Sequence, residues 1–243
     1  MNAKDRLIVA LDFDSLKKAE KLVDLLEDDV TTYKVGLQLF TKEGYRSLNM
    51  LKKRNKKIFL DLKFHDIPNT VVGAVSSVLE HGVDMLTIHA MGGFDMMESV
   101  AKLIWQRREN KSHAPKIFAV TLLTSLDSAF LQDIIGATSR SVQEEVLILA
   151  QAARSAGIDG VVASPLEVKM LRKKCGDELL ILTPGIRPKG SEKNDQQRSA
   201  TPFDAIKDGA DYIVVGRPIT ASEKPKSVVK SILKEIKDGL KNS

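Results

Sequence analysis

The chain has 243 residues, of which 43% are hydrophobic, and a formal net charge of +5. It contains no run of about 18 apolar residues and no apolar segment after a basic start, so we expect neither a membrane span nor a secretory signal peptide. Cys175 is the only cysteine, which excludes a disulfide within this sequence. Together these features indicate a cytoplasmic protein with no membrane partner.

Much of the basic excess lies in two runs, at 52–57 and 224–241. Such runs can bind nucleic acid, but these two lack interleaved aromatic residues, and acids such as Glu235 and Asp238 interrupt the second. We therefore interpret them as solvated helix faces and turns and expect no nucleic-acid partner. A net positive field would still attract a small anionic substrate.

Short segments rich in β-branched residues alternate along the chain with longer amphipathic stretches, as in repeated βα units. The predicted strands are 6–12, 32–36, 57–63, 85–89, 116–121, 160–163, 179–183 and 212–215. The predicted helices include 16–26, 69–81, 94–107, 141–156, 165–174 and 227–240. Eight strands, each followed by a helix, predict one (β/α)8 TIM barrel over residues 1–243, with the chemistry on the loops at the carboxyl ends of the strands.

The stretch 187–200 is long and polar for a connection between a strand and a helix. Loops of this kind are often lids over active sites, although a tolerated surface insertion would have the same composition. Its place after the seventh predicted strand favours a mobile lid.

Four charges of alternating sign end the first three predicted strands. Asp12 ends the first, Lys34 lies near the end of the second, and Asp61 and Lys63 end the third. A lone charge at a strand end is usually the beginning of a polar loop. Four such charges on one rim of a barrel instead indicate a functional network.

The third strand carries the most informative part of this pattern. Successive side chains of a strand point to opposite faces, so Asp61 and Lys63 share one face while Leu62 and Phe64 take the other. An acid and a base on the inward face are costly unless they pair or do chemistry. Asp66 adds a second carboxylate just beyond the strand end.

The seventh and eighth strands run into glycine and arginine, where barrels frequently bind phosphate. Gly185 and Arg187 follow strand 179–183, and Gly216 and Arg217 follow strand 212–215. Glycine lets backbone N–H groups approach an anion closely, and arginine is a charge-assisted, potentially bidentate donor. The helix expected after Gly216 adds its positive end. We therefore expect a phosphate site here.

The string D-L-K-F-H-D-I-P-N-T at 61–70 closely resembles the D-x-K-x-x-D-I-P-N-T signature of the orotidine 5′-monophosphate decarboxylases. The resemblance extends along nearly the whole chain, through L-D ending at 12, K-V-G at 34–36, T-P-G-I-R-P at 183–188 and V-G-R-P-I-T at 215–220. It implies a barrel enzyme of pyrimidine nucleotide biosynthesis that converts orotidine 5′-monophosphate to uridine 5′-monophosphate without a metal or organic cofactor.

The resemblance also implies roles for individual residues. Lys63 would donate the proton to C6 of the pyrimidine, and Asp61 would lie beside the departing carboxylate. Lys34 would hold Asp61 and, with Asp12, contact the ribose. The histidines inside and outside the signature are interpreted as structural: His65, His81, His89 and His113.

By the same resemblance the protein would be a homodimer, with Asp66 and Thr70 of one chain reaching into the active site of its partner. Thr124 would contact the amide edge of the pyrimidine. The phosphate grip would comprise Arg187, Gln196, Gly216 and Arg217. Gln196 lies in the expected lid, so phosphate binding could close that loop over the base and contribute to catalysis.

Two alternatives stay open. A magnesium-dependent sugar-phosphate decarboxylase or aldolase of a related barrel group uses a similar D-x-K-x-x-D arrangement, and Asp12, Asp61 and Asp66 could supply the oxygens that magnesium prefers. Two lysines would compete for those oxygens, however, and I-P-N-T resembles the nucleotide enzyme. A non-catalytic nucleotide-binding barrel is the other alternative, although it would have no need for the acid-base alternation.

Overall fold

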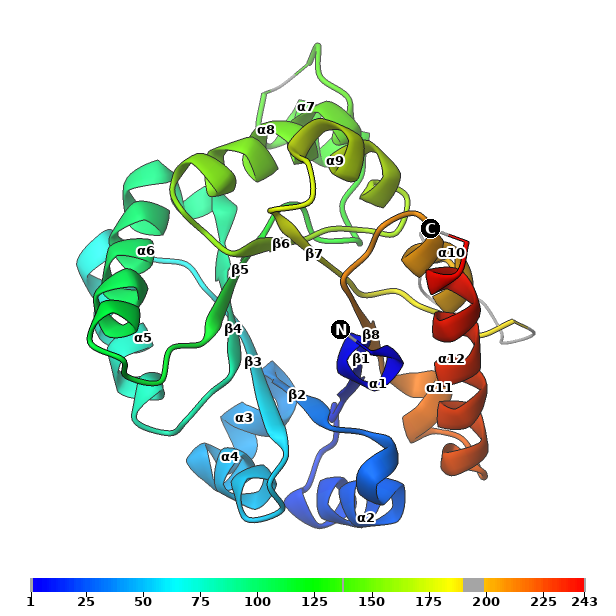
Figure 1. The fold of residues 1–243 in the computed structure, drawn as a ribbon. Helices are drawn as coiled ribbons and strands as arrows, with labels where there is room; N and C mark the ends of the chain where they lie inside the picture. The colour runs from blue at the N-terminus through cyan, green and yellow to red at the C-terminus, as the bar shows by residue number, and fades with distance from the viewer. Residues whose placement is uncertain (1, 137, 190–198, 243) are drawn as a thin grey trace.

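The computed structural model describes residues 2–136, 138–189 and 199–242, and its eight parallel strands close into a barrel in the order β1 to β8 (Figure 1). The strands are β1 Leu7–Ala10, β2 Thr32–Gly36, β3 Lys57–Phe64, β4 Met85–His89, β5 Lys116–Val120, β6 Gly160–Val162, β7 Leu180–Thr183 and β8 Tyr212–Val215. The predicted (β/α)8 barrel is confirmed. Three strands, β2, β4 and β8, have the predicted bounds, whereas β1 ends at Ala10, so Asp12 lies two residues beyond it.

Helices surround the barrel (Figure 1). They are α1 Ala3–Arg6, α2 Leu16–Leu26, α3 Leu37–Glu43, α4 Tyr45–Lys52, α5 Pro68–Leu79, α6 Phe94–Glu109, α7 Ser128–Asp133, α8 Val142–Ser155, α9 Val168–Cys175, α10 Pro202–Lys207, α11 Arg217–Thr220 and α12 Pro225–Leu240, with short 3₁₀ turns at Glu27–Asp29 and Ala90–Gly92. Each predicted helix is present, and α2 has the predicted bounds.

The sequence patterns do not predict α3, α4, α7 or α10. These helices span six to eight residues, which is too short for a 3.6-residue period to stand out. Two helices, α3 and α4, connect β2 to β3, and Gly44 separates them. Its φ of 55° is not helical, so α3 ends before it and α4 begins after it.

Side chains alternate along each strand between the outside and the inside of the barrel, so the apolar residues form two sets. Those that point outward pack against the helices, whereas those that point inward form a separate cluster in the barrel interior, comprising Ile8, Ala10, Phe59, Met85, Phe118, Leu182, Tyr212 and Val214. The ring of Phe118 packs edge-on against Phe59 and Tyr212, with centroid distances of 6.3 and 5.9 Å. This cluster fills the barrel and supplies the floor of the cavity at its mouth.

Strand β3 pairs regularly with β4 in its first half and irregularly near its carboxyl end. Phe59 and Leu60 pair in register with β4, but the register shifts before Phe64, which pairs with Ile88. Lys63 lies within this shift and has a φ of 52°. The alternation predicted for the end of β3 is therefore interrupted by a local distortion at the residue expected to carry the chemistry.

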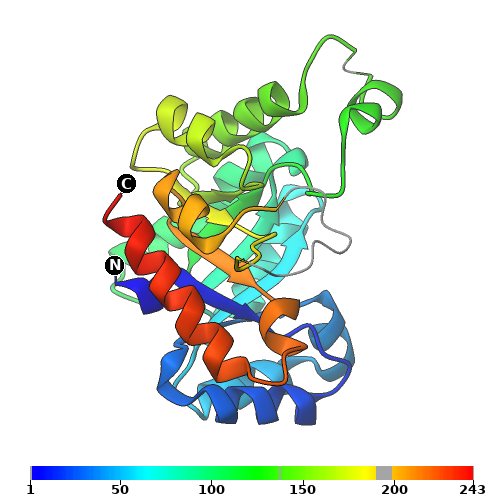
Figure 2. The same cartoon turned by 90° about the vertical axis from the view of Figure 1, so that its right-hand side faces the viewer.

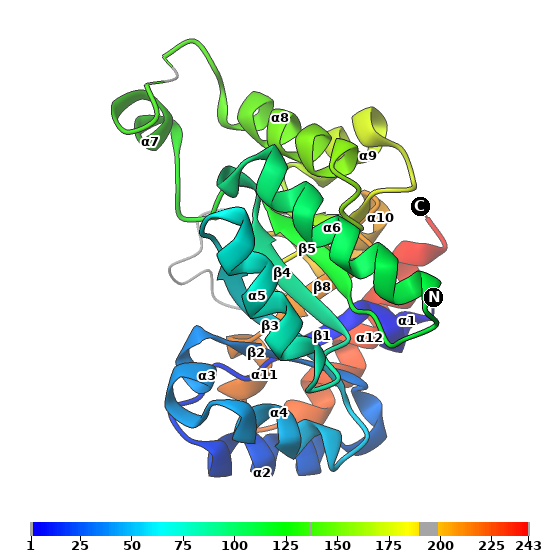
Figure 3. The same ribbon diagram turned by 90° about the vertical axis from the view of Figure 1, so that its left-hand side faces the viewer.

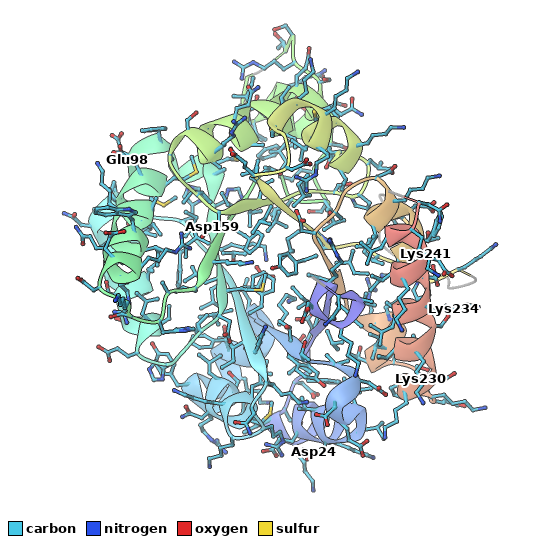
Figure 4. The ribbon with its side chains drawn as sticks, viewed as in Figure 1. Asp24, Glu98, Asp159, Lys230, Lys234 and Lys241 are labelled. Atoms are coloured by element: carbon cyan, nitrogen blue, oxygen red, sulfur yellow. The ribbon has the colours of Figure 1, made fainter. Side chains whose placement is uncertain are left out.

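The carboxyl ends of the strands form the mouth of the barrel. Figures 2 and 3 show α7 projecting beyond this end, whereas both chain termini lie at the opposite end. The basic C-terminal run lies on α12 and just after it, and Lys230, Lys234 and Lys241 are exposed there (Figure 4). Its interpretation as a solvated helix face is confirmed. Among the described residues, no helix has both the length and the apolar character to span a bilayer.

Candidate active site at the barrel mouth

A cavity of about 350 Å³ opens at the carboxyl ends of the strands. Its floor is apolar and includes Phe59, Leu182 and Val214 from the interior cluster. Its walls carry a group of charged side chains that the sequence singled out, comprising Asp12, Lys34, Asp61, Lys63, Arg187 and Arg217. The strand ends therefore bring together residues up to about two hundred positions apart in the chain.

The four predicted charges form one continuous chain of ion pairs. Lys34 Nζ lies 3.0 Å from Asp12 Oδ1 and 3.5 Å from Asp61 Oδ2. Lys63 Nζ lies 2.9 Å from Asp61 Oδ1. Lys34 and Asp61 are each only 9% exposed, so their interactions are weakly screened by water. The expected network of alternating charges is thus present in a partly buried setting.

Burial by itself would raise the pKa of Asp61. The positive charges of Lys34 and Lys63, together with hydrogen bonds from Lys63 and Thr87, outweigh that effect and hold the pKa of the carboxyl below its ordinary value. Asp61 is therefore a carboxylate at neutral pH. Its negative charge faces the cavity beside the Lys63 ammonium.

The backbone at Lys63 is unusual for a residue inside a strand. A φ of 52° is in the left-handed region, which costs roughly 1–3 kcal/mol for a residue with a side chain and persists only where the surroundings enforce it. The Lys63 N–H donates to Thr87 Oγ1 at 2.9 Å, and this bond is part of what holds the distorted backbone. Strain of this kind is frequent at functional sites.

Gly36 leaves room for the first ion pair. A Cβ at this position would lie 2.7 Å from Lys34 Nζ and 3.0 Å from Asp12 Oδ1, both closer than normal contact. The glycine of the K-V-G motif therefore has a steric role, because any side chain would have to displace the ammonium.

The ends of β7 and β8 supply the part of the cavity wall where the sequence predicts a phosphate site. Gly185 and Arg187 follow β7, and Gly216 and Arg217 follow β8, and all four line the cavity. The Arg187 backbone N–H donates to the Ala200 carbonyl at 2.9 Å, which joins the two described ends of the predicted lid. Gln196 and most of 187–200 lie outside the described residues. Thr124 lines the cavity four residues beyond β5.

Asp66 and Thr70 do not join this cavity within one chain. Asp66 is exposed and lines a second, shallower hollow on the same rim with His65, Ile67 and residues before α6. Its Oδ1 accepts the Ile67 N–H at 2.7 Å. Thr70 is exposed in the first turn of α5. Within the single chain, neither residue lines the cavity that holds Lys63.

Sequence reasoning missed two features around Lys63. Thr87 is fully buried in β4, and its one signal is a polar residue among the apolar residues Met85, Leu86 and Ile88 of that strand. His65 and His89 stack with ring centroids 5.2 Å apart. Burial, with the nearby His65 and Lys63, lowers the pKa of His89 to about 4, so its imidazole is neutral at neutral pH.

Comparisons with known proteins agree over nearly the full length. The family model described as "Orotidine 5'-phosphate decarboxylase / HUMPS family" matches residues 5–232. A relative from Moorella thermoacetica named orotidine 5'-phosphate decarboxylase is 48% identical, with 97% of this chain and 94% of the relative covered. One of the same name from Nostoc sp. is 46% identical, with 96% and 98% covered.

Solved structures show the same likeness. A crystal structure of orotidine 5'-phosphate decarboxylase from Lactobacillus acidophilus matches with a TM-score of 0.82 and 39% identity, covering 94% of this chain and 97% of that one. An uncharacterized conserved protein from Geobacillus kaustophilus also matches with a TM-score of 0.82, at 34% identity and with 94% and 99% covered.

Proposed function

The chain belongs to the orotidine 5'-phosphate decarboxylase / HUMPS family, and from this premise we propose that it converts orotidine 5′-monophosphate to uridine 5′-monophosphate in pyrimidine nucleotide biosynthesis. The family description covers two names, but curated relatives at 41–48% identity and nearly full coverage carry the first. The observation that carries the proposal is the ion-pair chain Asp12–Lys34–Asp61–Lys63 on the wall of a cavity that also holds two arginines.

The proposed reaction uses the chain's own side chains. The bond between C6 and the carboxylate breaks, CO2 leaves, and the electron pair stays on C6. The Lys63 ammonium stabilises this developing charge and then gives C6 its proton, becoming a neutral amine that solvent reprotonates. Its position 2.9 Å from Asp61 Oδ1 supports this role, because the ion pair with this carboxylate holds the ammonium at the cavity wall.

Asp61 and Lys34 complete the proposed catalytic group. Asp61 is ionised and would lie beside the substrate carboxylate. When CO2 leaves as a neutral molecule, the negative charge moves from that carboxylate to C6, where the Lys63 ammonium stabilises and then protonates it. Lys34 holds Asp61 from its other oxygen and, through Asp12, extends the network toward the ribose hydroxyls. No metal or organic cofactor takes part in this scheme.

The cavity wall at the ends of β7 and β8 would bind the phosphate of the substrate. Arg187 and Arg217 supply positive charge, and Gly185 and Gly216 let backbone N–H groups come close. Gln196 would reach the same group from the proposed lid. Thr124 would contact the pyrimidine amide edge. The reacting base would then lie between the phosphate site and Lys63, so that binding energy from the phosphate helps to hold C6 in place.

The working enzyme would be a cytoplasmic homodimer in which Asp66 and Thr70 act in the partner's site. Two observations support this arrangement. Both residues are exposed and do not line the cavity of their own chain, and Ile67 beside them is 68% exposed, so a partner could cover an apolar side chain here.

Turnover tests the proposal directly. The purified protein should convert orotidine 5′-monophosphate to uridine 5′-monophosphate, followed by the loss of the orotate-ring absorbance and by release of CO2. Substrate bound without turnover would favour a non-catalytic nucleotide-binding barrel instead.

The magnesium-dependent alternative makes a different prediction. Lys34 and Lys63 already occupy oxygens of Asp12 and Asp61 that a divalent cation would need, which favours the metal-free reaction. Activity that is lost on chelation and restored by magnesium, with a sugar phosphate as substrate, would support the alternative.

A further inference from the structure

We propose that Thr87 is a positioning residue for the reaction: its hydroxyl holds the backbone of Lys63 and the carboxylate of Asp61 at the same time, and so aims the Lys63 ammonium. The inference deepens the proposed function and rests on it. Thr87 does not line the cavity, so it acts through its two neighbours and not on substrate.

A single oxygen of Thr87 makes two hydrogen bonds. Thr87 Oγ1 accepts the Lys63 N–H at 2.9 Å and donates to Asp61 Oδ1 at 3.0 Å. A hydroxyl carries one proton and two lone pairs, so it can fill both roles at once, and its proton is directed by the negative charge of Asp61. The side chain is fully buried, so water does not compete for either bond.

The hydroxyl lies where the strand ladder is irregular. The register between β3 and β4 shifts between Leu60 and Phe64, and Lys63 within that shift has a left-handed φ of 52°. Residues with a side chain rarely adopt this conformation, and Lys63 adopts it inside a strand, where neighbouring groups must hold it. The bond from the Lys63 N–H to Thr87 is a direct means of enforcement, because it ties the distorted residue to the neighbouring strand.

The same hydroxyl fixes the orientation of Asp61. Oδ1 accepts from both Thr87 and Lys63, at 3.0 and 2.9 Å, while Oδ2 faces Lys34 at 3.5 Å. Without Thr87 the carboxylate would lose one of its fixed partners and the Lys63 backbone its anchor. The ammonium would then move relative to C6, and misplacement by about 1 Å can cost about 100-fold in rate.

The test compares three variants. Thr87→Val keeps the shape and removes the hydroxyl, and Thr87→Ser keeps the hydroxyl. Thr121→Val is the matched control, because Thr121 is also fully buried, one residue beyond β5, and its hydroxyl donates to the Val162 carbonyl at 2.9 Å and not to a charged group. Each is assayed for kcat and KM with orotidine 5′-monophosphate, for binding of uridine 5′-monophosphate, and for Tm.

We expect Thr87→Val to lower kcat by about 10- to 100-fold with a KM change of less than about threefold, since the phosphate and ribose contacts lie elsewhere. Thr87→Ser should recover most of kcat. Thr121→Val should lose a similar amount of stability but keep kcat near the wild-type value. In Thr87→Val the pKa of Asp61, followed by carboxyl NMR, should rise because a hydrogen bond to its charged form is gone.

Equal kcat values for Thr87→Val and Thr121→Val, with an unchanged pKa of Asp61, would overturn the inference while wild-type turnover leaves the proposed function intact. A wild-type protein that does not turn over the substrate would overturn both. If Thr87→Val does not fold at the assay temperature, Thr87→Cys gives the same comparison, because a thiol is only a weak donor and acceptor.

Discussion

Gly36 lies so close to Lys34 that a Cβ at position 36 would be 2.7 Å from the Lys34 ammonium. The backbone of Gly36 is extended, with a φ of −99°, so alanine fits the conformation and only the contact is unfavourable. The neighbouring atom is the end of a flexible side chain, which can move aside. A methyl group at this position therefore acts on the charge network and not on the fold.

We predict that Gly36→Ala lowers kcat/KM by about tenfold or more, because displaced Lys34 loosens both Asp12 and Asp61. The free energy of unfolding should fall by no more than about 1 kcal/mol. Gly73→Ala is the control: Gly73 lies in α5 with open space around its would-be Cβ, so activity should be unchanged and stability equal or higher. Urea unfolding and steady-state kinetics measure both effects. Normal activity in Gly36→Ala would show that the position of Lys34 is not critical.

Arg217→Ala tests the proposed phosphate site at the ends of β7 and β8. Arg217 lines the cavity after β8, so its loss should lower kcat/KM for orotidine 5′-monophosphate by about 100-fold, as charge-assisted bonds to an anion contribute about 1.5–3 kcal/mol each. The same substitution should matter far less with orotidine, which lacks the phosphate. Arg46→Ala, which removes an exposed arginine outside the cavity, should leave both substrates unaffected. Equal losses with both substrates would assign Arg217 a structural role.

The lowered pKa of His89 predicts that the stability of the fold depends on pH. In the folded state its pKa is lowered to about 4, whereas in the unfolded chain it is near 6.5, so between these values the unfolded state binds the extra proton. The free energy of unfolding should therefore fall as pH drops from about 6.5 to about 4. His89→Asn should show a shallower fall over this window, measured by urea unfolding. A parallel profile for wild type and His89→Asn would contradict the shift.

Asp66 and Lys63 lie three residues apart in sequence, yet the proposed dimer assigns them to different sites. Asp66→Asn and Lys63→Ala should each be nearly inactive alone. Mixed under conditions of subunit exchange, they should regain up to about a quarter of wild-type activity per subunit, since half of the dimers are mixed and each has one intact site.

The control for that mixture is Asp61→Asn with Lys63→Ala. Asp61 and Lys63 are in contact within one chain, so every site in this mixed dimer carries a lesion and no activity should return. If Asp66→Asn with Lys63→Ala also fails to recover, although mixed dimers form, Asp66 does not act in the partner's site.

The barrel and its charged rim were predictable because both depend on local pattern. Strand periodicity, turn glycines and the sign of charges at strand ends are properties of short segments, and eight such segments fix the topology. The distances among Asp12, Lys34, Asp61 and Lys63 follow from the barrel once the strand ends are known.

The remaining features depend on the register between neighbouring strands and on close contacts between side chains, which the pattern of a single segment does not encode. The role of Thr87 arises from the shift between β3 and β4, and that of Gly36 from the closeness of a side chain two residues away. The left-handed backbone conformation of Lys63 likewise could not be predicted from the sequence, because lysine rarely adopts it. In the proposed dimer, the surroundings of Asp66 and Thr70 would include a second chain.

The central claim is that Lys63 protonates C6 in a reaction that needs no metal. It is tested by measuring uridine 5′-monophosphate formation from orotidine 5′-monophosphate with wild type, Lys63→Ala and the control Lys57→Ala, an exposed lysine at the start of the same strand, after exhaustive chelation. We predict full activity for wild type and Lys57→Ala and a loss of at least about 100-fold for Lys63→Ala, with product binding retained. Near-normal turnover by folded Lys63→Ala, or wild-type activity that returns only when magnesium is added, would contradict the claim.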